Sequence, residues 1–190
     1  IVHFGSATGF LPGPLQAAYT DLLAKAKANN AIISFDPNYR HLLFQNNTQS
    51  FINQSWPFLE QCHFFKLSDE EAMLITGCDS VQHAAAALRK RSDAIFAITL
   101  GKEGTLLSVG DHLEMIGSIP ITPVDATGAG DAFVGAVLFQ LINYTPAQLN
   151  AISLEEWKKI IANANKAGAR TCEYMGAMEA FKHLNNSIFN

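Results

Sequence analysis

The stretch at residues 62–77, CHFFKLSDEEAMLITG, carries the pattern that decides the fold. Its first part, CHFFKL, is a short apolar and aromatic run of the kind that forms a buried strand. A helix is expected to begin at Ser68, and Gly77 is expected to end it, because glycine adopts the left-handed conformation that closes many helices. A strand that passes directly into a helix predicts one strand–helix unit of an α/β protein.

The same alternation continues on both sides of this unit. Short apolar runs predict further strands at residues 1–4, 31–35 and 94–100. The runs GTLLSV and HLEMI flank Gly110 and Asp111, which predicts a hairpin at the edge of the sheet. Strands that are separated by helices and short polar joints predict a mainly parallel sheet in a single domain.

Helical spacing of apolar residues covers much of the remaining chain. It predicts helices at 14–30, from Thr48 onward, at 80–91, and then at 132–142, 154–170 and 177–184. Ser80 is the expected N-cap of its helix. Pro57 is expected to disturb the helix that begins at Thr48, or to end its first half, because proline has no backbone N–H.

The composition of the 190-residue chain limits the classes of function. Its net charge of −4 is mixed in sign, which argues against a polybasic surface for nucleic acid or membrane lipid. The chain has no apolar run of roughly 20 residues and no basic start typical of a secretory signal. Three scattered cysteines and six histidines without metal spacing predict reduced thiols in a cytoplasmic protein and no zinc site. Because the chain opens as IVHFG, without Met, a preceding segment is expected.

A second stretch, PVDATGAGDAFVGAVLFQL at residues 123–141, places glycines and an aspartate ahead of an apolar helix. The backbone N–H groups of Ala129, Gly130 and Asp131 would form an anion site at the N-terminus of that helix. The glycines are not followed by the lysine of a P-loop. A dinucleotide-binding loop needs its third glycine earlier than Gly135, and Asp131 would repel a resting pyrophosphate.

Phosphoryl transfer gives this aspartate a chemical role. The backbone amides would face a γ-phosphoryl group as it separates, and the carboxylate of Asp131 would take the proton of the attacking hydroxyl. The alternative is an ordinary acidic residue that is favoured by the positive end of the helix dipole. The residues alone leave both interpretations open.

The segment VDATGAGDAFVGA resembles the C-terminal signature of the ribokinase-like (PfkB) family of carbohydrate kinases. Four further segments are similar to family motifs and follow in the family's order: SFDPNYRHLLF, FFKLSDEEAMLITG, AITLGKEGTLL and CEYMGAMEAF. The first of these four resembles a stretch seen in fructokinases and the related ketodeoxysugar kinases, and the last resembles the fructokinase branch. Together the five matches span nearly the whole chain, and they imply a three-layer α/β/α fold with a mainly parallel sheet.

The resemblance also implies roles for residues at the matching positions. Asp131 would be the catalytic base, and Gly128, Ala129 and Gly130 would form the anion hole with it. The expected ATP-binding residues are Thr99, Gly101, Gly104 and Asn163, and the expected substrate-binding residues are Asp36, Asn38 and Arg40. Glu71 would organise Mg²⁺ through water, and Asp125 with the carbonyl of Thr127 would bind K⁺, as in many relatives.

Simpler explanations exist for several of these residues. Ser68 stands where many relatives have Asn, and Ser68-x-x-Glu71 is also a capping box, which would stabilise the helix start without any metal. The GKEG segment also fits a tight turn between strands. Asp36 followed by Pro37 also fits a turn that ends a strand, and Asp125 alone fits a loop acid.

The activity implied by the resemblance is ATP-dependent phosphorylation of a sugar hydroxyl, with fructose as the first candidate and 2-keto-3-deoxygluconate as the runner-up. A non-catalytic nucleotide-binding module and an NAD-binding domain are alternatives of other classes. In the family, an N-terminal half and a small β lid hold the sugar, and relatives often dimerise through the lid. Residues 1–190 are therefore expected to be the C-terminal portion of one kinase domain, with little activity alone.

Overall fold

The computed structural model describes residues 1–5, 7–44 and 47–189 of the chain. Its sheet has six strands, which lie side by side in chain order. They are β1 (Val2–Gly5), β2 (Ile33–Asp36), β3 (Phe64–Ser68), β4 (Ile95–Thr99), β5 (Thr105–Val109) and β6 (His112–Ile116). Strands β1 to β4 are parallel, and β5 and β6 add an antiparallel hairpin at the far edge. The prediction of a mainly parallel sheet with an edge hairpin is therefore confirmed.

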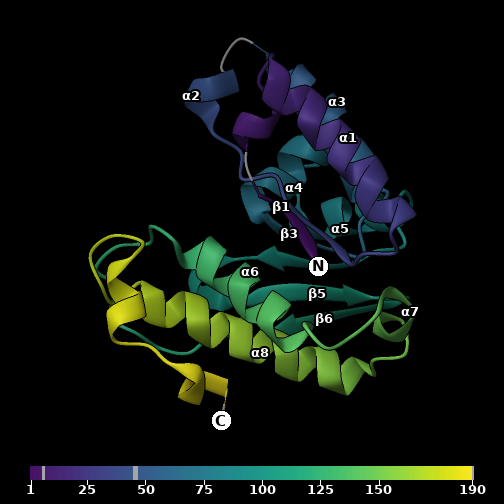
Figure 1. Ribbon diagram of the computed structural model, residues 1–190. Coiled ribbons are helices and arrows are strands. Elements are labelled where there is room, and N and C mark those ends of the chain that lie inside the picture. The colour runs from purple at the N-terminus through teal and green to yellow at the C-terminus, as the bar shows by residue number, and fades with distance from the viewer. Residues whose placement is uncertain (6, 45–46, 190) are drawn as a thin grey trace.

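Helices cover both faces of this sheet, as Figure 1 shows. One face carries α1 (Pro14–Ala28), α2 (His41–Phe44), α3 (Thr48–Leu59), α4 (Asp69–Thr76) and α5 (Val81–Arg89). The other face carries α6 (Ala129–Gln140) and α8 (Leu154–Thr171), and α7 (Pro146–Leu149) lies between these two in the chain. The parallel strands follow one another across the sheet, and right-handed crossovers then put their connecting helices on a single face. The result is a three-layer α/β/α arrangement.

Two apolar cores follow from the alternation of side chains along the strands. On the α1–α5 face, Phe35, Phe65 and Phe96 belong to one buried cluster. On the α6 and α8 face, the neighbouring residues Phe64 and Ile95 belong to the other. Strands that are buried on both faces read as continuous apolar runs, which is why short runs in the sequence predicted them.

The predicted strand–helix unit at 62–77 has the expected ends. Ser68 caps α4 through a capping box with Glu71, and Gly77 ends the helix at φ 70°. Ser80 caps α5 by accepting a hydrogen bond from the amide of His83. These ends were predictable because each depends on residues three or four positions apart.

Three local expectations need correction. Pro57 lies inside α3 and neither ends nor divides it, because the burial of Phe58 and Leu59 outweighs one lost hydrogen bond in the last turn. Helix α6 begins at Ala129 rather than at residue 132. Residues 177–184 do not form an α-helix. They contain the 3-10 turn Glu179–Lys182, and within this segment only Ala180 is buried, so no apolar face supports a longer helix.

The remaining short turns are 3-10 segments at Ala7–Phe10, Gly101–Glu103 and Asn186–Phe189. Within the described ranges, no helix combines the length and the apolar character needed to span a bilayer.

Candidate active site

The N-terminus of α6 lies next to the carboxyl ends of the parallel strands. A Cβ atom on Gly130 would lie 3.1 Å from Nζ of Lys66 in β3. The charge of Asp131 acts on His3 in β1. Burial lowers the pKa of His3, and the nearby carboxylate of Asp131 opposes that shift. The glycine–aspartate loop and the ends of β1 to β3 therefore share one site, at the edge where ligands bind in open α/β sheets.

The helix start at Gly128 exposes unpaired backbone donors. Gly128 is the N-cap, it adopts φ 84°, and no side chain caps the helix there. The amide of Ala129 donates to the carbonyl of Ala126 over 3.2 Å. The amides of Gly130 and Asp131 donate to no acceptor within the part of the chain that the structure describes. Two of the three predicted anion-hole donors are therefore free, and Asp131 beside them is exposed.

Glycine is required at position 128 by packing as well as by conformation. A Cβ atom there would lie 2.8 Å from the Cβ of Ala177, closer than two carbon atoms can approach. The chain after α8 thus packs directly against the turn that opens α6. This contact fixes the direction in which the free amides point.

Asp125 ties the same turn to the chain after α8. Its Oδ1 accepts hydrogen bonds from the amide of Thr127 at 2.9 Å and from the Thr127 hydroxyl at 2.7 Å. Its Oδ2 accepts from the amide of Gly176 at 2.8 Å. The Thr127 hydroxyl, with these amides, lowers the pKa of Asp125. The carboxylate of the predicted K⁺ site thus holds the loop and keeps one lone-pair position on Oδ2 for a cation.

Asp36 and Lys66 form a buried ion pair below the start of α6. Lys66 Nζ lies 3.2 Å from Oδ2 of Asp36, and their side chains are 9% and 5% exposed. Burial raises the pKa of Asp36 to about 6, against the lowering effect of Lys66. Lys66 was not predicted as a site residue. The signal was present, since it is the one charged residue in the apolar strand run CHFFKL.

Glu71 connects the β3–α4 junction to the loop that follows Asp36. Its Oε2 accepts from the amide of Ser68 at 2.8 Å, and its Oε1 accepts from the amide of Tyr39 at 2.6 Å. Ser68 Oγ completes the capping box by accepting from the amide of Glu71 at 3.1 Å. A carboxylate has about four lone-pair positions, so Glu71 keeps capacity for a water-mediated bond to a metal ion.

The predicted substrate residues lie in the loop that Glu71 holds. Asn38 has φ 49°, an unusual conformation for a residue other than glycine, and its amide donates to Oδ1 of Asp36 over 3.1 Å. Arg40 is exposed, and its guanidinium donates to the adjacent carbonyl of Tyr39 over 3.2 Å. Its guanidinium retains donors for an oxyanion.

The predicted nucleotide loop follows β4. Thr99 ends the strand, and its hydroxyl donates to the carbonyl of Leu67 over 3.3 Å. Gly101 and Gly104 adopt φ 56° and 109°. A Cβ on Gly104 would lie 2.1 Å from the carbonyl oxygen of Ile116, so this glycine is required by the approach of β6 whether or not a nucleotide binds.

Asn163 lies on α8 and contacts the C-terminal half of α6 rather than the glycine–aspartate loop. Its Nδ2 donates to Oε1 of Gln140 over 2.9 Å, at the C-terminal end of α6 and about 18 Å along that helix from Gly128. The buried asparagine of the same helix is Asn165, which bonds Thr105 at 2.6 Å and the carbonyl of Ile116 at 3.0 Å. Asn165 therefore fixes α8 to the hairpin.

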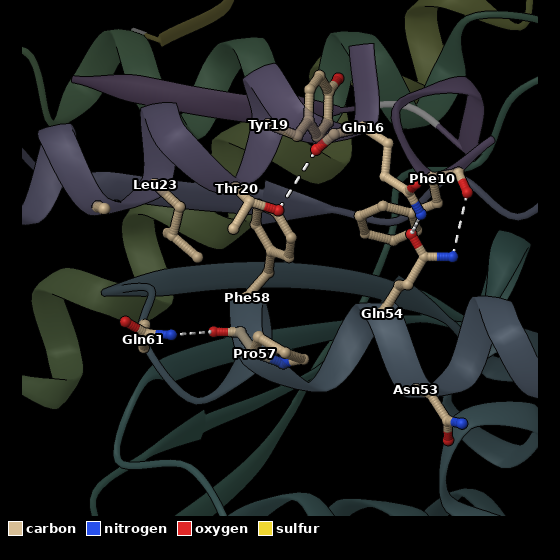
Figure 2. A pocket seen from close by; sticks show the side chains of 11 residues that line it. Phe10, Gln16, Tyr19, Thr20, Leu23, Asn53, Gln54, Pro57, Phe58 and Gln61 are labelled. Carbon is tan, nitrogen blue, oxygen red and sulfur yellow. Dashed lines mark hydrogen bonds between the residues drawn. The ribbon is translucent and has the colours of Figure 1, made fainter. Parts of the chain in front are cut away.

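A cavity of about 320 Å³ lies between α1 and α3, on the opposite side of the sheet (Figure 2). Aromatic residues such as Tyr19 and Phe58 line it, together with Gln16, which is hydrogen-bonded to Gln54. None of the described side chains that line this cavity is charged, so it offers no cationic group to a phosphate. It is separate from the site at α6.

The chain is similar to a family of carbohydrate kinases and to several named proteins. A model of the pfkB family of carbohydrate kinases matches residues 1–184. Fructokinase-1 of Zea mays is 30% identical to this chain over 182 residues, which are 94% of this chain and 54% of the relative. Fructokinase-1 of Oryza sativa subsp. japonica is 31% identical over 184 residues, with the same coverage. The chain thus spans about half the length of these curated relatives.

Solved structures agree with these matches. A fructokinase from Vibrio cholerae O395, in its fructose, ADP and calcium ion bound form, has a TM-score of 0.85 and 26% identity, and the match covers 98% of this chain and 58% of that one. Aminoimidazole riboside kinase from Salmonella enterica, complexed with aminoimidazole riboside and an ATP analog, has a TM-score of 0.82 and 28% identity, over 94% of this chain and 58% of that one. The fold is ribokinase-like, and the chain belongs to the pfkB family of carbohydrate kinases.

Proposed function

We propose that this chain is the phosphoryl-transfer portion of an ATP-dependent sugar kinase, and that its sugar is fructose. The observation that carries the proposal is the start of α6. A glycine N-cap leaves the amides of Gly130 and Asp131 unpaired, and the exposed carboxylate of Asp131 lies beside them. This arrangement combines donors for a charged phosphoryl group with an acceptor for a proton.

In the proposed reaction, a sugar hydroxyl oxygen attacks the γ-phosphorus of ATP as the bond from that phosphorus to the β,γ-bridging oxygen breaks. The proton of the hydroxyl passes to the carboxylate of Asp131, and ADP leaves with the bridging oxygen. The amides of Gly130 and Asp131 stabilise the charge on the phosphoryl oxygens. Thr99, Gly101 and Gly104 border the proposed nucleotide site, with Asn163 on the helix expected to flank the adenine.

A magnesium ion would neutralise charge on the phosphates when bound. The described residues contain no group of three or more acidic, histidine or cysteine side chains able to hold a metal by themselves. Magnesium fits such a place because it is commonly held by one or two carboxylates, several waters and the substrate phosphates. Glu71, with spare lone pairs on a carboxylate already fixed by Ser68 and Tyr39, is the candidate.

Two findings support fructose as the substrate. The curated relatives named above are fructokinases, and the solved Vibrio cholerae fructokinase was obtained with fructose bound. Its structure superposes on 98% of this chain. The loop containing Asp36, Asn38 and Arg40 would then face the sugar or a phosphate, with its backbone held by Glu71.

The test is release of ADP from Mg·ATP in the presence of fructose, 2-keto-3-deoxygluconate or ribose. It compares the chain alone with the chain joined behind the N-terminal segment of the Vibrio cholerae fructokinase that it does not match. Fructose-dependent release that Asp131→Ala abolishes would support the proposal. Release only with 2-keto-3-deoxygluconate would reassign the sugar. ATP binding without sugar-dependent release in either form would favour a non-catalytic nucleotide-binding module.

A further inference from the structure

His3 is a histidine of β1 whose ring lies over the next glycine of the same strand. Phe4 belongs to the aromatic core beneath α1–α5, so its neighbours His3 and Gly5 face the α6 side of the sheet. A Cβ atom on Gly5 would collide with Nε2 of His3 and would lie 3.1 Å from its Cδ2. Gly5 is not among the glycines with positive φ, so the ring explains this glycine better than the backbone does. Nε2 therefore points toward the carboxyl end of β1.

Ser34 determines which nitrogen of the His3 ring carries the proton. The two residues are paired across β1 and β2, and Nδ1 of His3 lies 3.2 Å from Oγ of Ser34. Ser34 is 0% exposed, and within the described residues its hydroxyl has no other partner. A buried hydroxyl that donates to nothing costs free energy, so Ser34 donates to Nδ1. The proton of the neutral imidazole is then on Nε2, where no described group accepts it.

The charged groups near His3 leave one carboxylate available to a ligand. Asp36 lies beside Gly5 in the sheet, and its carboxylate is paired with Lys66 at 3.2 Å. Glu71 already accepts from two backbone amides. Asp131 is exposed and close enough for its charge to act on His3, yet no hydrogen bond joins the two in the part of the chain that the structure describes. A polyhydroxylated ligand, whose hydroxyls both accept and donate, could bond to both groups.

The order of the strands places His3 on the acceptor side of the site. The proposed nucleotide loop follows β4, the start of α6 lies over Lys66 of β3, and β1 lies beyond β2 in the other direction. In phosphoryl transfer the attacking and the leaving oxygen are roughly in line, with the phosphorus between them. With the nucleotide over the loop after β4, the sugar therefore approaches from the side of β1.

We propose that His3 is a sugar-binding residue that contributes to substrate specificity, with its Nε2–H donating to the hydroxyl next to the one that attacks, and that Ser34 is the positioning residue that keeps the proton on Nε2. This inference rests on the proposed function, because it names a sugar contact of the same site. The attacking hydroxyl needs a lone pair for phosphorus and gives its proton to Asp131, so the donor of His3 suits a neighbouring hydroxyl.

The kinetic experiment uses the joined protein described above, with fructose and with fructose analogues that each lack one hydroxyl. The variants are His3→Phe, which keeps a ring without a donor, His3→Gln, which keeps an N–H group, and the control His112→Phe in β6, the other edge strand, where the histidine is also exposed. Loss of one hydrogen bond predicts that His3→Phe lowers kcat/KM for fructose about three- to tenfold, mainly through KM.

One analogue should report the contact directly. For the analogue that lacks the bonded hydroxyl, His3→Phe should cause no further loss of kcat/KM, because the hydrogen bond is already absent. His3→Gln should keep part of the fructose activity, and His112→Phe should match the original protein. If His3→Phe fails to fold, His3→Ala takes its place in the same comparison.

Nitrogen-15 NMR of the histidine rings tests the premise on the whole chain without any activity. Nε2 of His3 should carry the proton and Ser34→Ala should weaken this preference, whereas a proton on Nδ1 would overturn the inference. An unchanged kcat/KM for fructose in His3→Phe, or the same loss with every analogue, would also overturn it and leave the proposed function standing. A lower kcat with a shifted pH profile and unchanged KM would do the same, since His3 would then act on Asp131. A joined protein without sugar-dependent release of ADP would refute both.

Discussion

Replacing Glu71 by alanine tests whether this residue holds the site together in the absence of a metal. The substitution leaves two backbone donors, the amides of Ser68 and Tyr39, without the acceptor that they have in the structure. Each unsatisfied, buried donor costs about 1–3 kcal/mol. Both bonds are only partly buried, so water recovers a share of that loss, and we expect the free energy of unfolding to fall by about 2–4 kcal/mol.

Urea unfolding followed by circular dichroism measures this change, with a chelator present and nucleotide absent. With a urea dependence of about 2 kcal/mol per molar, the midpoint should fall by about 1–2 M. The matched control is Glu70→Ala, an exposed acid in the same first turn of α4, which should cost only about 0.3–1 kcal/mol through the helix dipole.

Glu71→Gln removes the charge of this side chain and keeps its shape. It keeps one carbonyl oxygen for one of the two amides but turns an NH₂ group toward the other donor, so most of the loss should remain. A loss below about 1 kcal/mol for Glu71→Ala, or one equal to that of Glu70→Ala, would refute the reasoning. Glu71 would then be free to act on a metal alone.

Three further predictions concern the same site. Asp131→Ala should lower turnover by roughly 10²–10⁴-fold in the joined protein described above, measured as fructose-dependent ADP release, and near-normal turnover would exclude it as the base. Gly128→Ala should weaken Mg·AMP-PNP binding in calorimetry, because it forces a side chain into φ 84° and against Ala177, and an unchanged affinity would contradict the packing argument. Burial raises the pKa of Asp36 from 3.8 to about 6, so the folded state favours the protonated carboxyl. The stability that this preference contributes is fully present below about pH 4 and is lost as the pH rises through 6. Between pH 4 and pH 7 the free energy of unfolding in urea should fall by about 3 kcal/mol more in the original chain than in Asp36→Asn/Lys66→Met, and parallel pH profiles would contradict this.

The parts of the fold that could be predicted depend on residues close together in the chain. The capping box of Ser68 and Glu71 and the left-handed Gly77 are set within one short helix, so the sequence pattern predicted them. The inner strands β2 to β5 were predictable because both of their faces are buried, which leaves largely apolar runs. The segment 177–184 was wrongly predicted because its helical spacing is not matched by an apolar surface to pack against.

The candidate site also has a part that could be predicted from the sequence and a part that could not. The glycine–aspartate loop could be recognised, because its backbone donors and carboxylate are adjacent in sequence. The Asp36–Lys66 pair could not, since its members are 30 residues apart and meet only when β2 pairs with β3. Asn163 and Asn165 lie on one helix, α8, but Asn163 contacts α6 and Asn165 contacts the hairpin. The sequence pattern of α8 does not show which of these neighbours each asparagine faces.

The hydrogen bond from Gly176 to Asp125 has a consequence for genetic variation in this protein. It joins residues 51 positions apart, and Ala177 beside it packs on Gly128. A stop codon just after Cys172 would leave every described strand and α-helix encoded, yet it would remove the Gly176 and Ala177 contacts of the loop that opens α6, together with Ile188 and Phe189, which pack against the second core. Such an allele is expected to loosen the loop that opens α6, so that a change outside the glycine–aspartate motif would have the phenotype of a change within it.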